Sequence, residues 1–393
     1  AAPAGSAPPQ PPHHRSMPTA PVTGPTPAAG RSSWLRPVAV WVAAATVVGA
    51  SAVVAGTAFD VTTTSPGTAH AAPADHPTER VLTGHSTGVL AVATTRLDGR
   101  TALVSGSDDG TLRFWDAETG EQVGEPITRH RSAVRALVGG EVDGRPVVVA
   151  GGDDGAVRVW DAATRTETGR TIRAVLTRTR AVALGDLDGR PVIAYAGTEP
   201  TIRLADAATG DLVGAPLVGH LSGVGAVALT RLADRAVVVS ASEDGTVRLW
   251  DAATGAPIGE PMTGHRGGVD ALAVAVVDGR PVAVTGGDDG TVRRWDLTSR
   301  TPIGDPAAGH DGTVSAMTTA EVAGRPVVVS AGVDGALRLW DPATGTPIGE
   351  PLLGHSGPVT AAMVVDLAEG PVIVSGGQDA TVRTWDVRTR AAG

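Results

Sequence analysis

Short runs of apolar residues, separated by Gly-containing turns, fill residues 79–388. Such runs predict β-strands. Asp98-Gly99 lies between the first two runs and is typical of a two-residue hairpin, because both turn positions favour positive φ. The first unit therefore predicts a four-stranded antiparallel sheet. Its expected strands are Val89–Ala93, Thr101–Ser105, Thr111–Asp116 and Gln122–Ile127.

The same unit recurs every 45 residues, seven times and without insertions. A fixed period of this length indicates a repeat architecture. Runs such as Val147–Val149 and Val237–Val239 are apolar on both faces, so each sheet needs cover on both sides, which radial stacking provides. A Trp-Asp pair marks each unit except the third, where Ala205-Asp206 stands in its place. We therefore predict an all-β ring of seven sheets.

The two ends of the repeat region complete each other. Glu79–Leu82 is similar to an outer strand such as Pro351–Leu353, and the chain leaves after the third strand at Trp385-Asp386. We expect residues 79–83 to pair with the last sheet, which would close a domain spanning 79–393 without an exposed edge. The third unit keeps its Asp188–Arg190 turn, which favours seven sheets over six.

The recurring Gly-His, Ser or Thr, Asp-Gly and Trp-Asp positions resemble those of WD-repeat (WD40) β-propellers over residues 79–388. The resemblance implies a buried tetrad in each sheet, or blade, in which the polar groups satisfy one another. Five units carry it in full. These are His85, Ser105, Asp109 and Trp115; His220, Ser240, Asp244 and Trp250; His265, Thr285, Asp289 and Trp295; His310, Ser330, Asp334 and Trp340; and His355, Ser375, Asp379 and Trp385.

Two units depart from the family pattern. The second has His130, Asp154 and Trp160, but Ala150 lacks the hydroxyl group. The third lacks the tetrad altogether. It carries Val175, Tyr195, Glu199 and Ala205 at the four positions. This third unit is interpreted either as neutral drift or as an adaptation to binding.

The chain ahead of the repeats predicts three segments. Residues 1–34 are rich in Pro and Ala and are expected to be disordered. Residues 35–59 are expected to form a transmembrane signal anchor, because 37–59 carries no charge and is long enough to span a bilayer. Residues 60–78 would form a stalk.

Arginines precede the apolar segment and none follows until Arg80, so the positive-inside rule places the N-terminus in the cytoplasm and the propeller outside the cell. Two alternatives stay open. Ala69–Ala71 is similar to a signal-peptidase site, which would give a secreted protein, although the apolar stretch is long for a signal. The segment could also be a buried helix of a soluble protein.

The amino-acid composition excludes several kinds of functional site. The 393 residues include no Cys, Lys or Asn, which excludes disulfides, the phosphate-binding lysine of a Walker A loop and a kinase catalytic lysine. Arg as the sole basic residue type beside His suggests a GC-rich, bacterial genome. The net charge is −9 and the acidic excess lies in the repeats, which argues against nucleic-acid binding.

No group of residues predicts catalysis, a metal site or a cofactor. Residues 84–88 read GHSTG, which fits a nucleophile elbow, but the surrounding repeats are all β rather than α/β. The histidines are one blade apart, too far to share a zinc ion. The Asp-Asp-Gly turns lack the spacing of a calcium loop.

The remaining candidate site is a basic cluster on the second and third units, with acids on neighbouring turns. Such a face suits an acidic peptide or polymer, although a solvated surface of mixed charge is the plainer interpretation. The cluster consists of Arg131, Arg135, Arg178 and Arg180, and the acids are Asp108, Asp153, Glu243 and Asp288.

Together these features predict a non-enzymatic scaffold, a monomer tethered to the cell membrane by one helix, that binds a protein or peptide through its loops. The alternative is the sensor portion of a larger signalling protein, since bacterial WD-repeat domains often resemble the C-terminal part of serine/threonine kinases. Fold alone does not decide between them.

Overall fold

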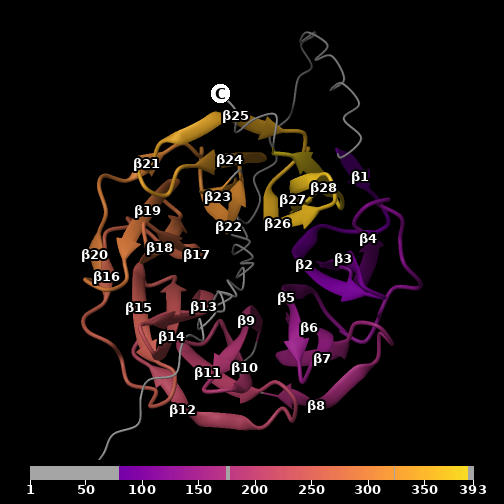
Figure 1. Cartoon of the computed structure of the whole chain (residues 1–393), viewed down its shortest axis with the longest axis horizontal. Helices are drawn as coiled ribbons and strands as arrows, with labels where there is room; N and C mark the ends of the chain where they lie inside the picture. Colours follow the sequence, from indigo (N-terminus) through magenta and orange to yellow (C-terminus); the bar gives the residue numbers. More distant parts are fainter. Residues whose placement is uncertain (1–78, 174–177, 323, 388–393) are drawn as a thin grey trace, which may run out of the picture. The chain divides into compact units, whose positions relative to one another are not determined.

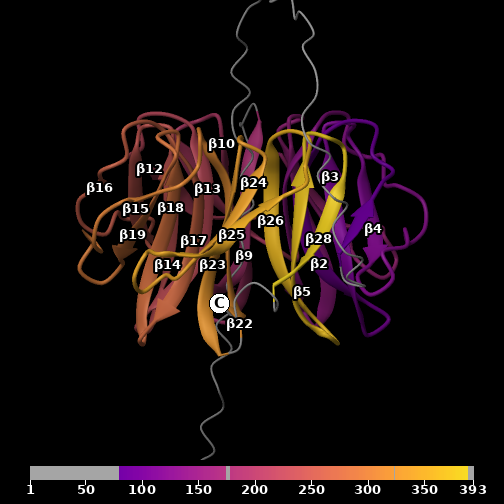
Figure 2. The same cartoon turned by 90° about the horizontal axis from the view of Figure 1, so that it is seen from above.

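The computed structural model describes residues 79–173, 178–322 and 324–387, and these form a seven-bladed β-propeller, as predicted. Seven antiparallel sheets are arranged around a ring, with the first strand of each sheet nearest the centre (Figures 1 and 2). Within these ranges no helix is long and apolar enough to cross a membrane. The predictions for 1–34, 35–59 and 60–78 fall outside the described residues.

Each blade is built from consecutive strands, counted here from the centre outwards. Blades 1 to 4 contain β2 (Val89–Leu97), β3 (Arg100–Ser107) and β4 (Leu112–Asp116); β5 (Val134–Val142), β6 (Arg145–Gly152), β7 (Ala156–Asp161) and β8 (Glu167–Arg173); β9 (Thr179–Leu187), β10 (Arg190–Gly197), β11 (Thr201–Asp206) and β12 (Leu212–Val218); and β13 (Val224–Leu232), β14 (Arg235–Ser242), β15 (Thr246–Asp251) and β16 (Met262–Thr263).

Blades 5 to 7 follow the same order. They contain β17 (Val269–Val277), β18 (Arg280–Gly287), β19 (Thr291–Asp296), β20 (Thr301–Pro302) and β21 (Ala307–Ala308); β22 (Val314–Val322), β23 (Arg325–Gly332), β24 (Ala336–Trp340) and β25 (Pro347–Leu353); and β26 (Val359–Leu367), β27 (Gly370–Gly377) and β28 (Val382–Asp386), with β1 (Arg80–Leu82) outermost.

The first hairpin turn has the predicted backbone: Asp98 and Gly99 have φ values of 49° and 78°. The predicted fourth strand of blade 1, Gln122–Ile127, is wrong as a continuous strand. It makes only isolated bridges, Trp115 with Gln122 and Leu112 with Ile127. Between them, Gly124 adopts a φ of 66°, but Gly169 and Gly214 adopt nearly the same left-handed conformation within the continuous strands β8 and β12, so this glycine alone does not explain the interruption.

Ring closure rests on β1, which pairs antiparallel with β28 in the register Arg80↔Thr384, Val81↔Arg383 and Leu82↔Val382. The Leu82 side chain is buried in the apolar cluster that joins blades 7 and 1. The start of the domain therefore supplies the outer strand of its last blade.

The apolar core lies between blades. Each tetrad tryptophan packs against the preceding blade: Trp250 lies in a cluster with residues of blade 3, and Trp295 in a cluster with residues of blade 4. Tyr195 occupies the corresponding seam between blades 2 and 3, next to the small Ala205. In the blades with a complete tetrad a small Ser or Thr on the second strand lies beside a large Trp on the third strand. In blade 3 the sizes are reversed, with the large Tyr195 beside the small Ala205, so the seam stays packed.

Candidate functional site

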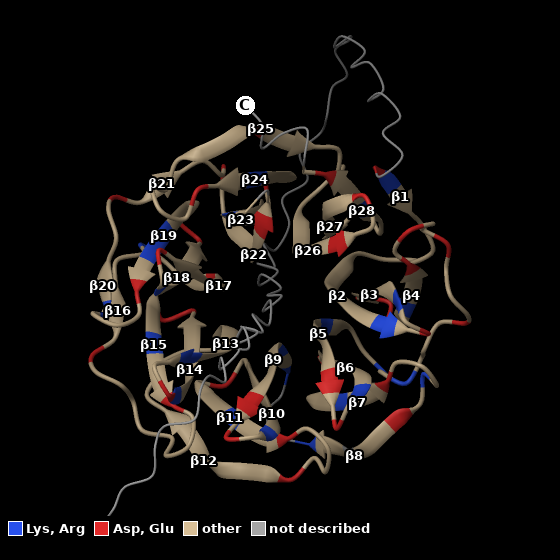
Figure 3. Cartoon of the chain, viewed as in Figure 1, with Lys and Arg blue, Asp and Glu red and all other residues tan. Residues whose placement is uncertain are grey.

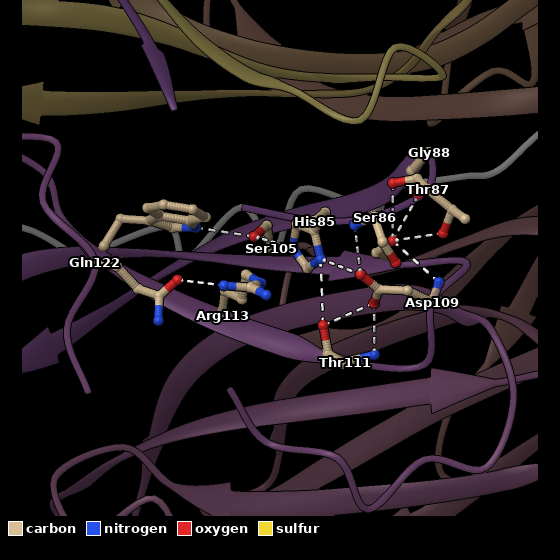
Figure 4. Close-up of polar contacts among 11 residues, drawn as sticks. His85, Ser86, Thr87, Gly88, Ser105, Asp109, Thr111, Arg113 and Gln122 are labelled. Atoms are coloured by element: carbon tan, nitrogen blue, oxygen red, sulfur yellow. Dashed lines mark hydrogen bonds and ion pairs between the residues drawn. The ribbon is translucent and has the colours of Figure 1, made fainter. Parts of the chain in front are cut away.

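The tetrad of blade 1 forms one chain of hydrogen bonds (Figure 4). The Trp115 indole N–H donates to Ser105 Oγ over 2.9 Å, and Ser105 Oγ lies 2.7 Å from His85 Nε2. His85 Nδ1 lies 3.0 Å from Asp109 Oδ2. Because the Asp109 carboxylate can only accept, the neutral imidazole carries its proton on Nδ1 and donates it to Asp109, and Ser105 therefore donates to the unprotonated Nε2.

Asp109 also holds the adjoining loop and turn. Its carboxylate accepts hydrogen bonds from the Ser86 and Thr111 amides and from the Thr111 hydroxyl. Burial alone would raise the pKa of Asp109, but these bonds outweigh it and lower the pKa to about 2. Burial lowers the pKa of His85, against the opposing effect of Asp109, so the ring stays neutral near pH 7.

The same contacts recur in blades 4 to 7. The His Nε2 to hydroxyl distances are 2.7–2.9 Å, and each tryptophan donates over 2.8 Å. Each tetrad therefore fastens a Gly-His loop, a turn and two strands. The residues brought together are His220, Ser240, Asp244 and Trp250; His265, Thr285, Asp289 and Trp295; His310, Ser330, Asp334 and Trp340; and His355, Ser375, Asp379 and Trp385.

Blades 2 and 6 replace the turn threonine by Ala156 and Ala336, and an arginine takes over its contact. In blade 6 the Arg338 guanidinium donates to Asp334 over 2.8 Å and lies 2.9 Å from His310 Nδ1. Arg158 does the same in blade 2, donating to Asp154 over 2.7 Å. A threonine hydroxyl in the turn and an arginine guanidinium on the third strand can thus each donate a hydrogen bond to the tetrad aspartate.

Blade 2 has an incomplete tetrad because residue 150 is alanine. Among the described residues, His130 Nε2 and the Trp160 indole nitrogen are buried without a hydrogen-bond partner. Both atoms would bond the missing hydroxyl in an intact blade, so the alanine leaves two polar groups unsatisfied.

Blade 3 has no tetrad among its described residues, and Val175 lies outside them. Tyr195 is fully buried, and its hydroxyl has no partner in the part of the chain that the structure describes. Burial raises the pKa of Tyr195 to about 12, although nearby Arg203 opposes the shift. Glu199 is half-buried and Ala205 is buried, so neither reproduces the role of the residue it replaces.

These contacts leave the intact tetrads little capacity for chemistry. Both ring nitrogens of each intact tetrad histidine contact the framework, so none is free to act as a base. The residues that the structure describes contain no group of three or more His, Asp or Glu able to hold a metal ion.

The arginine cluster lies on the loop face, defined here as the face that carries the Gly-His loops and the turns before each third strand. Arg135 pairs with Asp153, and Arg180 pairs with Glu243 of blade 4; both are mostly covered. Arg131 is exposed, and the Arg178 side chain is 54% exposed. Only Arg131 and Arg178 of the four are therefore well placed to meet a partner.

Sequence reasoning overlooked Arg129, which is exposed on the same loop as Arg131. Its position in the repeat could have revealed it. Most units have a glycine before the tetrad histidine, such as Gly84 before His85, whereas the second unit has Arg129 there. Figure 3 shows that acidic and basic positions are interleaved between neighbouring blades. The exposed cations therefore form a local patch of Arg129, Arg131 and Arg178, which we call the arginine patch, although Arg178 Nε also lies 4.0 Å from Asp153 Oδ1.

Comparison with known proteins matches this chain to the family described as WD domain, G-beta repeat. The match covers more than half of the chain and omits most of blades 3 and 6. It comprises residues 77–116, 121–161, 212–251, 255–296 and 345–386.

Similarity to individual curated proteins is local. WD repeat-containing protein 1-B of Xenopus laevis is 40% identical over 42 residues, which make up 11% of this chain and 7% of that protein. WD repeat-containing protein 1 of Xenopus tropicalis is 43% identical over 42 residues, with the same coverage. The chain thus matches less than a tenth of the length of these relatives.

Proposed function

Because this chain belongs to the WD40 (WD domain, G-beta repeat) family, we propose that it is a protein-interaction scaffold that binds an acidic peptide segment of its partner on the loop face. WD40 propellers are generally non-catalytic, and the tetrads use their polar groups to hold the blades rather than to react. A rigid ring with variable loops is suited to presenting a binding surface.

The observation that supports an acidic partner is the arginine patch. Arg135 and Arg180 are mostly covered and closely paired within the protein, whereas Arg129, Arg131 and Arg178 are exposed on two adjacent loops, and Arg178 makes only a long 4.0 Å contact with Asp153. Guanidinium groups bind carboxylates through paired, charge-assisted hydrogen bonds. The patch is local, so it can attract an acidic segment although the propeller as a whole is acidic.

The test is affinity capture from the source cells with the full chain and with the double variant Arg131→Glu/Arg178→Glu. Partners retained by the wild type should be lost, and their capture by the wild type should weaken as salt rises. Arg325→Glu, an exposed arginine on the opposite face, is the matched control. Equal capture of every partner by the double variant would refute the patch as the binding site.

We further propose that residues 35–59 tether a monomeric propeller to the membrane, with 1–34 cytoplasmic and 60–78 as an external stalk. Support comes from the uncharged stretch 37–59 and from Arg31 and Arg36 ahead of it. Protease added to intact cells should then degrade the propeller. A protected propeller would contradict the outside placement, and a propeller free in the medium would favour secretion. Bacterial origin remains a prediction from the arginine-only composition.

A further inference from the structure

Every inner strand carries one irregular position at its loop-face end. The register of the inner hairpin shifts there in all seven blades, which marks a β-bulge. Bulges redirect a side chain out of the regular ladder. The seven residues are Leu90, Arg135, Arg180, Gly225, Asp270, Ser315 and Thr360.

At this position side chains connect neighbouring blades. The Ser315 hydroxyl donates to the Val359 carbonyl of blade 7, and the Thr360 hydroxyl donates to the Val89 carbonyl of blade 1. Arg180 reaches Glu243 in the next blade in the same way. Asp270 occupies this place at the seam between blades 4 and 5, where it is only 4% exposed.

Asp270 is buried among more acids than bases. Its Oδ1 lies over Gly225 of β13, where an added Cβ would come within 3.0 Å. The charged groups that face it are Asp288 from the β18–β19 turn, Glu243 from the β14–β15 turn and Arg180 from β9. The equivalent position of β22 is Ser315, which does not ionise. Three carboxyl groups thus share one guanidinium.

The other two acids already have donors. Glu243 pairs with Arg180 and accepts a bond from the Ser222 hydroxyl. Asp288 accepts bonds from the Gly268 amide and the Thr313 hydroxyl, each over 3.0 Å. Asp270 therefore lacks a cation of its own, and it can bond the Asp288 carboxylate only by donating a proton.

We propose that Asp270 and Asp288 of blade 5 share a proton, and that this proton lets Asp270 remain packed against Glu243 and Gly225 of blade 4, which makes the seam between blades 4 and 5 responsive to pH near neutrality. When the proton leaves, a third negative charge appears beside Glu243 and Asp288, and the buried carboxylate repels both. The seam then loosens at the loop face. The proposal does not depend on the identity of any partner.

The electrostatics agree with this geometry. Burial, with smaller contributions from Asp288 and Glu243, raises the pKa of Asp270 to about 7, and Arg180 opposes the shift. A group whose pKa is higher in the folded than in the unfolded state stabilises the fold most at low pH. That stability is lost as pH rises from the unfolded value near 4 to about 7.

The tetrad histidines act in the opposite direction. Burial lowers the pKa of His220 and of His265, so their contribution to stability is lost as pH falls. A comparison of the wild type with Asp270→Asn separates the two effects, because both proteins share the histidines and the asparagine amide can still donate to Asp288.

The experiment is denaturant unfolding of the full chain from pH 5.5 to 7.0. The wild-type folding constant should fall about 15-fold relative to that of Asp270→Asn, because one proton gives a tenfold change per pH unit well below the folded pKa of about 7 and a smaller change as the pH approaches it. Asp311→Asn, which removes an exposed acid on the same face, should follow the wild type. Parallel pH profiles for the wild type and Asp270→Asn would overturn the proposal.

Infrared spectroscopy supplies a measurement that does not depend on the stability of a variant. At pH 6 the wild type should show the carbonyl band of a protonated aspartic acid, and this band should disappear near pH 7. Asp288→Asn removes a neighbouring charge, so the band should disappear at lower pH in that variant. A wild-type protein with no protonated carboxyl at pH 6 would refute the shared proton.

Discussion

The incomplete tetrad of blade 2 allows a sharp test of what the tetrads contribute: Ala150→Ser should stabilise the protein. The backbone already places residue 150 correctly. Ala150 pairs with Leu137 and Arg158 just as Ser105 pairs with Val92 and Arg113 in blade 1. A serine hydroxyl at 150 should therefore lie between His130 Nε2 and the Trp160 indole, as Ser105 does between His85 and Trp115.

The magnitude follows from the two unsatisfied atoms. Each buried polar group without a partner costs about 1–3 kcal/mol. The new hydroxyl must itself leave water, at a cost of about 1–3 kcal/mol that its hydrogen bonds offset in part. The expected net gain is about 1–3 kcal/mol. For a domain of this size that corresponds to a rise of roughly 2–6 °C in the melting temperature.

The assay is thermal and denaturant unfolding of the wild type, Ala150→Ser and Ala150→Val. The valine variant adds volume without a hydroxyl, so it should not stabilise. Ser105→Ala creates the blade 2 defect in blade 1 and should destabilise by a similar amount. A serine variant no more stable than the wild type would show that the His130 and Trp160 atoms are not a stability defect.

Two further substitutions test the tetrads and the closure of the ring by β1. Arg338→Ala should destabilise the protein by about 1 kcal/mol more than Arg248→Ala, because Arg338 bonds the tetrad aspartate of blade 6, whereas Thr246 makes that bond in blade 4. Equal losses of stability in urea unfolding would show that Arg338 does not replace the turn threonine. Leu82→Ala should lower the free energy of unfolding by about 2–4 kcal/mol and expose the edge of β28 to protease. Val81, on the same strand, is half exposed, so Val81→Ala should lower it little. Resistance of Leu82→Ala to limited proteolysis would argue against β1 as the closing strand.

The blades could be predicted from the repeat period because residues close together in the sequence determine the turns and strands of each blade. Asp98-Gly99 specifies its own turn, and positions at fixed intervals such as Ser105 and Trp115 become diagonal neighbours whenever the strands pair. Gln122–Ile127 was harder, since its pattern is as strand-like as those of β8 and β12, which carry a left-handed glycine at the same position and are continuous strands. Its reduction to two isolated bridges therefore leaves no clear mark in the sequence.

Contacts between blades were beyond sequence reasoning. Arg135 and Arg180 had the pattern of a basic surface, yet their guanidinium groups are neutralised by Asp153 and by Glu243 of another blade. Pairing across a seam depends on the bulge that redirects each side chain, and a bulge leaves no clear mark in the sequence. Asp270 escaped notice for the same reason, because its burial arises only when blades 4 and 5 meet.

The closing strand also determines how the domain responds to force. Tension transmitted through the chain ahead of Arg80 acts first on the three residue pairs that join β1 to β28. The other blades are loaded only after those pairs separate, since each of them is continuous in the chain. Pulling on the N-terminal side, as a bound partner would if the protein is anchored there, should therefore detach one short strand and leave six blades intact.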